Sequence, residues 1–459
     1  NLTLTIPDYR SAYGEEFGFQ QASVNSKPEV IPSLQEWHGY TGEFRLTEDS
    51  KIIYQDTASK GIEKVAQHMK EDLLEITGLE LTVVEGDGPT APQDIYIGSQ
   101  TEDTYGVGEE GYFLVTNEEG IHIYAPSYTG CLYGTITVEQ ILYQAEDNKT
   151  VPRGVSRDYP AYQVRGVMLD IARTPYRLSQ LKDYTKIMLW YKMNEFHLHV
   201  NDNDNTNTAF ATEETHMGFH RLESETSPSL VSEVKKVGPP AEFINEDYYL
   251  NNEDYQGNPH YTKEEWKELS ALCEENGMYL LTEIDLPGHS LLYNKYAKEN
   301  PDNIDWLEGG IHYTDNRLGS RGGLELLALT GDNADRAKRF AETLWEEYTQ
   351  GTDPFISGDI VHIGADEYWD HDASLKDPFA LLADSLRQII HNLGEQTKIR
   401  MWGAGTGMFS TASTALNGVD LPANYQLDLW HTSYENPRLR MQEGYEVVNC
   451  RDAFVYGNP

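Results

Sequence analysis

The chain has 459 residues, of which 39% are hydrophobic and 11% aromatic, so it can bury a large core and is not a disordered protein. Asp and Glu number 75 against 35 Lys and Arg, which gives a formal net charge of −40 without a basic patch. Such a charge repels the phosphates of nucleic acids and favours neutral ligands. We therefore expect no nucleic-acid partner. No stretch approaches the roughly 20 apolar residues of a spanning helix, so we also expect no membrane span in this chain.

Residues 1–33 are polar, lack clear periodicity and are interpreted as an N-terminal extension. Residues 34–155 alternate strand-like and helix-like patterns and predict a small α+β domain. Its first helix is expected over 61–77, where apolar residues recur at helical spacing. The other elements expected in this domain are strands at 51–54, 79–84, 94–98, 111–116 and 120–125 and a second helix from 128 to 142.

From residue 164 strands and helices alternate, which is typical of a parallel sheet covered by helices. A (β/α)8 TIM-type barrel has eight such strands, whereas the sequence predicts seven. We therefore expect residues 156–459 to form a barrel that is C-terminally incomplete and lacks its last strand in this chain. The seven strands are expected at 164–172, 194–200, 278–284, 360–365, 398–403, 425–430 and 445–450.

Functional groups in such barrels lie at the carboxyl ends of the strands. Here these ends are rich in carboxylates, imidazoles and indoles. Carboxylates accept hydrogen bonds from hydroxyl groups and indoles cover apolar sugar faces, so the pattern predicts a saccharide pocket. The residues concerned are Asp170, Arg173, His197, His199, Asn201, Asp202, Glu283, Asp285, His289, His362, Asp366, Glu367, Trp402 and Trp430.

Asp366 and Glu367 leave the end of one strand together and can face one pocket. A like charge nearby and partial burial raise one of two carboxyl pKa values, which prepares that group to act as an acid. An Asp-Glu pair is a weak signal in so acidic a chain, because most such pairs are solvated. This pair, however, follows an apolar strand at 361–365 and precedes two aromatic residues.

Four sequence segments resemble, in order, the first four strand motifs of glycoside hydrolase family 20, the β-N-acetylhexosaminidases. They are RGVMLDIAR at 165–173, KMNEFHLHVND at 192–202, TEIDLPGH at 282–289 and HIGADE at 362–367. Residues 34–155 also resemble the small domain that precedes the barrel in that family. The resemblance implies a glycoside hydrolase without a cofactor or a metal.

The resemblance also implies a catalytic set consisting of Glu367, Asp366 and Tyr456. Glu367 matches the general acid and base, while Asp366 and Tyr456 match the residues that hold the 2-acetamido group of the substrate. That group's carbonyl oxygen attacks C1 and forms an oxazolinium intermediate, so the enzyme supplies no nucleophile.

The residues implied to bind the substrate are Arg165, Asp202, His289, Trp402 and Trp430, with Asp285 and His199 behind them. Arg165 matches an arginine that binds sugar hydroxyls; the alternative for it is an internal salt bridge. Trp402 and Trp430 match walls of the acetamido pocket. The long polar segment 203–261 is expected to border the site.

The expected activity is therefore exo-acting, retaining removal of terminal β-linked N-acetylhexosamine from oligosaccharides or glycoconjugates, by a secreted or cell-surface bacterial protein. A lacto-N-biosidase that releases Gal-β1,3-GlcNAc is the nearest alternative. Two alternatives come from other classes. One is a non-catalytic glycan-binding surface protein, and the other is a metal-dependent hydrolase with ligands among His197, His199, Asp285, His289, His362 and Asp366.

Overall fold

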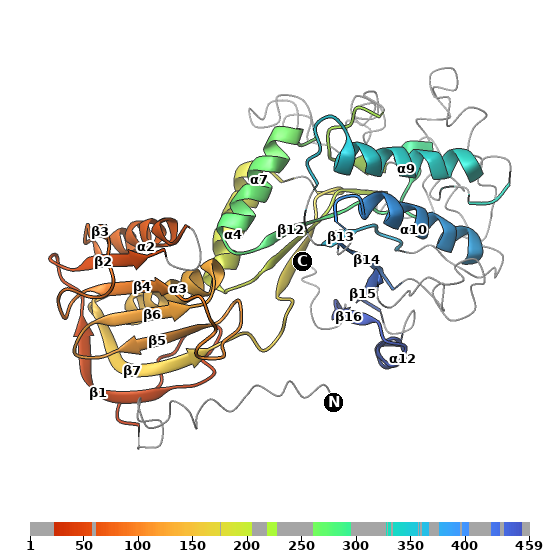
Figure 1. Ribbon diagram of the computed structural model, residues 1–459. Coiled ribbons are helices and arrows are strands. Elements are labelled where there is room, and N and C mark those ends of the chain that lie inside the picture. Colours follow the sequence, from red (N-terminus) through yellow and green to blue (C-terminus); the bar gives the residue numbers. More distant parts are fainter. Residues whose placement is uncertain are drawn as a thin grey trace. The chain divides into compact units, whose positions relative to one another are not determined.

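The computed structural model describes residues 23–56, 61–174, 176–203, 218–226, 260–294, 327, 329–331, 334–356, 358, 360–366, 376–394, 397–403, 424–431 and 436–451 (Figure 1). The chain forms two compact units. Unit 1 comprises Asn1–Arg165, Tyr184–Asn194 and Glu274–Met278, and unit 2 comprises Gly166–Asp183, Glu195–Cys273 and Tyr279–Pro459.

Unit 1 contains a seven-stranded mixed sheet with two helices packed on it and on each other (Figure 1). Along the sheet the strands are β1 (His38–Arg45), β7 (Thr150–Asp158), β5 (Tyr112–Thr116), β6 (Ile121–Ala125), β4 (Ile95–Ser99), β2 (Lys51–Gln55) and β3 (Thr82–Glu85). Helix α2 (Ile62–Thr77) buries the predicted apolar stripe and ends at Gly78, which adopts φ 73°. Helix α3 (Tyr128–Gln144) starts at Ser127, whose side chain accepts a hydrogen bond from the backbone N–H of Gly130.

The predicted N-terminal extension is partly attached to this unit. Asn25 donates from its side chain to the backbone oxygens of Gly42 and Arg153. The backbone of Ile31 exchanges two hydrogen bonds with the side chain of Gln140 on α3. Residues 1–22 lie outside the described residues.

Unit 2 contains a parallel sheet in which the seven described strands follow one another in chain order, and each predicted strand overlaps an observed one (Figure 1). This curled sheet is that of a TIM-type barrel, as the sequence predicts. The strands are β8 (Gly166–Asp170), β9 (Glu195–His199), β12 (Tyr279–Glu283), β13 (Ile360–His362), β14 (Lys398–Trp402), β15 (Tyr425–Leu429) and β16 (Glu446–Asn449). A short ribbon of β10 (Asn201–Asn203) and β11 (Gly218–His220) follows β9.

Helices connect these strands, as a parallel sheet requires. Helix α9 buries one stripe that includes Phe340, Leu344 and Tyr348 and leaves Arg339 and Glu346 exposed. None of the described helices is long and apolar enough to cross a membrane. The connecting helices are α4 (Leu178–Trp190), α7 (Lys263–Glu275), α9 (Ala334–Gln350), α10 (Lys376–Ile390) and α12 (Pro437–Gln442).

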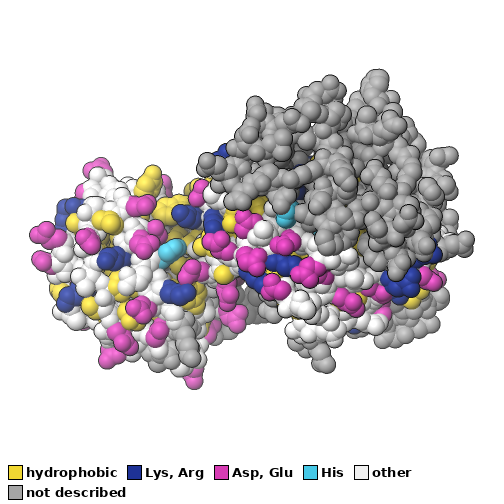
Figure 2. All heavy atoms as spheres, turned by 90° about the horizontal axis from the view of Figure 1, so that it is seen from above, with side chains coloured by type: hydrophobic (Ala, Val, Ile, Leu, Met, Phe, Trp, Pro, Cys, Tyr) yellow, Lys and Arg dark blue, Asp and Glu magenta, His cyan; other side chains and the backbone are white. Residues whose placement is uncertain are grey.

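The acidic side chains of the described residues do not form a single patch on the face seen in Figure 2. On the face seen in Figure 2, Asp and Glu side chains are scattered, with Lys and Arg side chains between them. Ion pairs such as Arg45 with Asp147 and Lys398 with Glu446 offset part of the charge locally. Of the three cysteines, Cys131 and Cys273 are buried and Cys450 is partly buried, and all three are free thiols.

The backbone after β13 turns sharply against the loop after β12. Gly364 adopts φ 74°, and a Cβ atom there would lie 2.1 Å from the Cα atom of Asp285. The next residue, Ala365, also adopts a left-handed φ of 72°, which is unfavourable for a residue with a side chain. This turn brings the backbone N–H of Asp366 within 3.1 Å of Asp285 Oδ1.

Replacing Gly364 by alanine tests this close approach. We expect the free energy of unfolding to fall by about 3 kcal/mol or more, because a left-handed residue with a Cβ costs roughly 1–2 kcal/mol and the new atom also overlaps the Asp285 backbone. Gly331 is a matched control: it adopts φ 82°, but a Cβ there would meet nothing within 4 Å. Urea unfolding of G364A and G331A should differ by at least about 2 kcal/mol, and equal losses would contradict the overlap.

Candidate active site

Asp202 is the centre of a charge cluster at the carboxyl ends of the unit 2 strands. It is 2% exposed and lies on β10, just after β9. Its Oδ2 lies 2.6 Å from His199 Nε2 and 2.6 Å from Arg173 Nη1, and its Oδ1 lies 2.5 Å from His289 Nδ1. One buried carboxylate therefore contacts three basic groups from different segments of the chain.

These contacts decide the protonation states. Burial alone would raise the pKa of Asp202, but His289 and His199 lower it well below its usual value. Burial would lower the pKa of both histidines, yet Asp202 and neighbouring carboxylates outweigh it. They raise the pKa of His289 to about 10 and that of His199 well above its usual value. At neutral pH an ionised Asp202 therefore lies between two imidazolium groups.

Asp285, at the end of β12, lies in a different electrostatic environment. Burial raises its pKa well above the usual value, and the neighbouring Glu283 adds to that shift while His289 opposes it. Asn201 fixes the Asp285 backbone, because its amide accepts from the Asp285 N–H at 2.7 Å and donates to the Asp285 carbonyl at 2.9 Å. This carboxyl group lies directly beside Asp366, whose backbone N–H donates to Asp285 Oδ1 at 3.1 Å.

Each of the two predicted pocket tryptophans donates its indole N–H to a carboxylate. Trp430, which follows β15, donates to Asp366 Oδ1 at 2.9 Å. Trp402, at the end of β14, donates to Glu283 Oε1 at 2.5 Å and is 3% exposed. The structure thus brings Asp202, His289, Asp285, His199, Asp366, Trp402 and Trp430 to one end of one sheet. The predicted catalytic residues Glu367 and Tyr456 lie outside the described residues.

The structure contradicts the assignment of Arg165 to the sugar site. Arg165 precedes the first residue of β8, so it lies at the amino end of that strand rather than the carboxyl end. Its guanidinium pairs with Glu110 at 2.8 Å and donates to the carbonyl oxygens of Lys192 and Tyr162, all within unit 1. The alternative interpretation, an internal salt bridge, is the one that the structure supports.

Arg173 is one of the strand-end residues of the predicted saccharide pocket, although the family resemblance assigned the sugar hydroxyls to Arg165. It lies beyond the carboxyl end of β8 and contacts Asp170 at 2.8 Å and Asp202 at 2.6 Å. Its side chain is 28% exposed, so the guanidinium is only partly covered. The motif at 165–173 carries an arginine at each end, and the direction of the strand identifies the one that reaches the mouth of the barrel.

Three groups of side chains have potential ligand atoms within 4.8 Å of one another: His197 with Glu283 and His362, His199 with Glu283 and Asp285, and Asp285 with His289 and Asp366. His199 and His289 have raised pKa values, so each holds the proton that a metal would have to displace. In the first group, His362 Nδ1 accepts from the Gly364 N–H at 3.1 Å. Within the described part of the chain, these side chains also contact one another as ion pairs, for example His197 with Glu283 at 2.8 Å and His289 with Asp285 at 3.7 Å.

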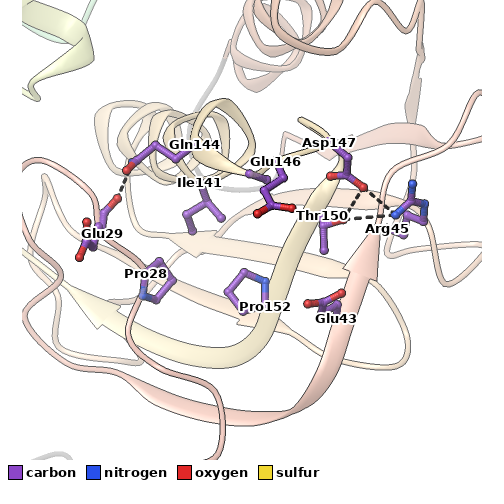
Figure 3. A pocket seen from close by; sticks show the side chains of 11 residues that line it. Pro28, Glu29, Glu43, Arg45, Ile141, Gln144, Glu146, Asp147, Thr150 and Pro152 are labelled. Atoms are coloured by element: carbon purple, nitrogen blue, oxygen red, sulfur yellow. Dashed lines mark hydrogen bonds and ion pairs between the residues drawn. The ribbon is translucent and has the colours of Figure 1, made fainter.

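A hollow lies in unit 1, with a volume of about 620 Å³. Glu29, Glu43, Glu146 and Asp147 line it together with Arg45, which is paired with Asp147 (Figure 3). None of the residues predicted to act on a substrate lines this hollow, so it is separate from the candidate site.

The matches to family models agree with this geometry. Residues 162–458 match the model described as "Glycosyl hydrolase family 20, catalytic domain", and residues 27–159 match the one described as "Glycosyl hydrolase family 20, domain 2". The chain belongs to glycosyl hydrolase family 20.

The individual relatives share less than a third of their aligned residues with this chain. A β-hexosaminidase of Vibrio furnissii is 28% identical over 75% of this chain and 48% of its own length. A lacto-N-biosidase of Bifidobacterium bifidum is 22% identical over 95% of this chain and 34% of its own length. This family 20 chain thus spans half or less of the length of these two relatives. The solved β-N-acetylhexosaminidase of Streptomyces coelicolor shares the fold, with a TM-score of 0.64 at 20% identity over 93% of this chain and 76% of its own.

The raised pKa of His289 predicts a pH-dependent stability. A histidine protonated in the folded state and neutral in the unfolded state stabilises fully below about pH 6.5, and that contribution disappears as the pH rises toward 10. We expect the free energy of unfolding to decrease between pH 7 and pH 9.5. In the H289Q variant this decrease should be smaller by about 1–3 kcal/mol.

His220 is a matched control, because burial lowers its pKa to about 3 and it does not titrate in this range. In urea unfolding, the free energy of unfolding of H220Q should therefore change between pH 7 and pH 9.5 by the same amount as that of the wild type. If the free energy of unfolding of H289Q also changes by the wild-type amount, His289 is not charged in the folded protein.

Proposed function

We propose that this chain is an exo-acting, retaining glycoside hydrolase that removes terminal β-linked N-acetylhexosamine by substrate-assisted catalysis. The observation that carries the proposal is the position of Asp366, whose carboxylate accepts from Trp430 at 2.9 Å and whose backbone N–H donates to Asp285 at 3.1 Å. Family membership and relatives named β-hexosaminidase support it. Glycans outside the cell are the proposed substrates, so we also propose a secreted or surface location.

The proposed reaction has two steps. In the first, the acetamido oxygen attacks C1 and forms the oxazolinium ring while Glu367 protonates the departing glycosidic oxygen. Asp366 accepts the acetamido N–H, which increases the electron density on the attacking oxygen. In the second step Glu367 takes a proton from water, the water oxygen bonds to C1, and the ring opens with the configuration retained.

Arg173 is the proposed partner of the sugar hydroxyl groups, in place of Arg165. A guanidinium offers several donors in a fixed plane, which suits two neighbouring hydroxyls. Asp170 and Asp202 orient that plane from behind. Trp430 is proposed to form a wall of the acetamido pocket and the buried Trp402 its floor.

A lacto-N-biosidase remains the second candidate, because the relative with that name aligns over 95% of this chain. Such an enzyme would accommodate galactose beyond the N-acetylglucosamine and release the disaccharide. The two activities share the acetamido site and differ only in the space beyond it.

Release of p-nitrophenol from the β-N-acetylglucosaminide and from the β-lacto-N-bioside, measured side by side, tests the function. We expect the wild-type chain to cleave one conjugate and Glu367→Gln to lose about 100-fold or more in kcat/KM, because a general acid and base contributes roughly 10²–10⁴. Glu118→Gln, at an 89% exposed position, should retain wild-type activity. Binding of glycans without cleavage of either conjugate would instead identify a binding protein.

The two arginines provide a second test. Arg173→Met should lower kcat/KM by about 100-fold or more, because it removes a sugar contact and one of the cations beside buried Asp202. Arg165→Met should change kcat/KM less than about 3-fold while lowering the free energy of unfolding by roughly 1–3 kcal/mol, since it breaks a partly buried ion pair. The reverse pattern of kinetic losses would restore the original assignment of Arg165.

A further inference from the structure

The indole of Trp402 is held on several sides by residues of other strands. Its N–H donates to Glu283 of β12, two strands away in the sheet order. Its ring stacks on His197 of β9 with centroids 5.8 Å apart and meets His362 of β13 edge-on at 5.3 Å. With 3% of its surface exposed, the ring has little freedom to rotate.

Glu283 connects this indole to the histidines of the site. It is fully buried, and its Oε2 lies 2.8 Å from His197 Nε2 and 3.0 Å from His199 Nδ1 while its Oε1 accepts from Trp402. Burial opposes the ionisation of Glu283, but His199 and the hydrogen bonds from the imidazoles hold its pKa well below the usual range. Both carboxylate oxygens are therefore engaged, and neither is available to a ligand.

His199 continues the connection to the charge cluster. One of its nitrogens faces Glu283 and the other faces Asp202, which in turn contacts His289 and Arg173. An unbroken series of buried contacts thus runs from the Trp402 indole to the residues around the proposed sugar site. We therefore expect a substitution of Glu283 to alter the positions of both Trp402 and His199.

We propose that Glu283 is a positioning residue that fixes the Trp402 indole as the floor of the acetamido pocket and makes the site selective for the size of the N-acyl group. The inference rests on the proposed function, because it assigns a part of the same site. Glu283 acts through Trp402 and His199 and does not touch the substrate. With the indole fixed, one extra methylene on the acyl group meets a wall that cannot move.

The position of Glu195 provides a matched control. It is also a buried glutamate of this sheet, 3% exposed on β9, and it pairs with Arg400 at 2.6 Å. Arg400 is further engaged by Asp428 at 3.4 Å and by Gln426 at 2.7 Å. None of the contacts of Glu195 in the described part of the chain involves Trp402, so Glu195→Gln disturbs the barrel interior without releasing the indole.

The experiment compares kcat/KM for p-nitrophenyl β-glucosaminides carrying N-acetyl and N-propionyl groups. One methylene in a tight apolar pocket changes kcat/KM by about 10–200-fold, so we expect the wild type to prefer the acetyl substrate. Glu283→Gln should reduce that preference about tenfold or more, whereas Glu195→Gln should keep it whatever its overall activity. A ratio is the informative quantity, because partial unfolding lowers both rates equally.

Glu283→Asp serves if the glutamine variant does not fold, since it keeps the charge but is one methylene too short to reach the indole. It should show the same loss of acyl preference. Failure of the wild type to cleave the N-acetyl substrate would overturn the proposed function itself. An active wild type with the same acyl ratio as the Glu283 variants would overturn only the positioning role.

Discussion

The contact of Asp202 with His199, His289 and Arg173 is the interaction on which the rest of the site depends. An isolated carboxylate that is only 2% exposed would strongly destabilise the fold. Here three basic groups and their hydrogen bonds offset the cost of burying the Asp202 charge. Each partner comes from a different part of the barrel: the loop after β8, strand β9 and the loop after β12. The ion pairs of Asp202 therefore hold three segments close together and fix the geometry at the carboxyl end of the sheet.

The same requirement explains why neighbouring carboxyl groups differ. Asp202 and Glu283 each face imidazoles that lower their pKa values, whereas burial, Glu283 and Asp366 raise the pKa of Asp285 against the opposing effect of His289 and His199. Groups whose surroundings push their pKa values apart are the usual basis of acid and base roles within one site. Left-handed backbone at Gly364, Ala365 and His289 accompanies this arrangement, which fits the general concentration of backbone strain at functional sites.

The sequence could predict the strands of the sheet because each is a short apolar run followed by polar residues, as at 194–202 and 278–285. It could also place Asp202, Asp285 and His289 at strand ends, since their position follows directly from the strand boundaries. The choice between Arg165 and Arg173 failed because both lie in one motif, and only the direction of β8 separates them. The contact of Trp402 with Glu283 joins residues 119 positions apart, and no local pattern encodes it.

The proposed mechanism requires the site to stabilise an oxazolinium-like species through Asp366 and its neighbours. Calorimetric titration with a thiazoline analogue of the N-acetylglucosamine oxazolinium ion, compared with N-acetylglucosamine itself, tests this most directly. We expect the analogue to bind at least about 100-fold more tightly than N-acetylglucosamine, as mimics of a reaction's high-energy species do, and Asp366→Asn to remove most of this difference in affinity. Equal affinities for the two ligands would contradict it.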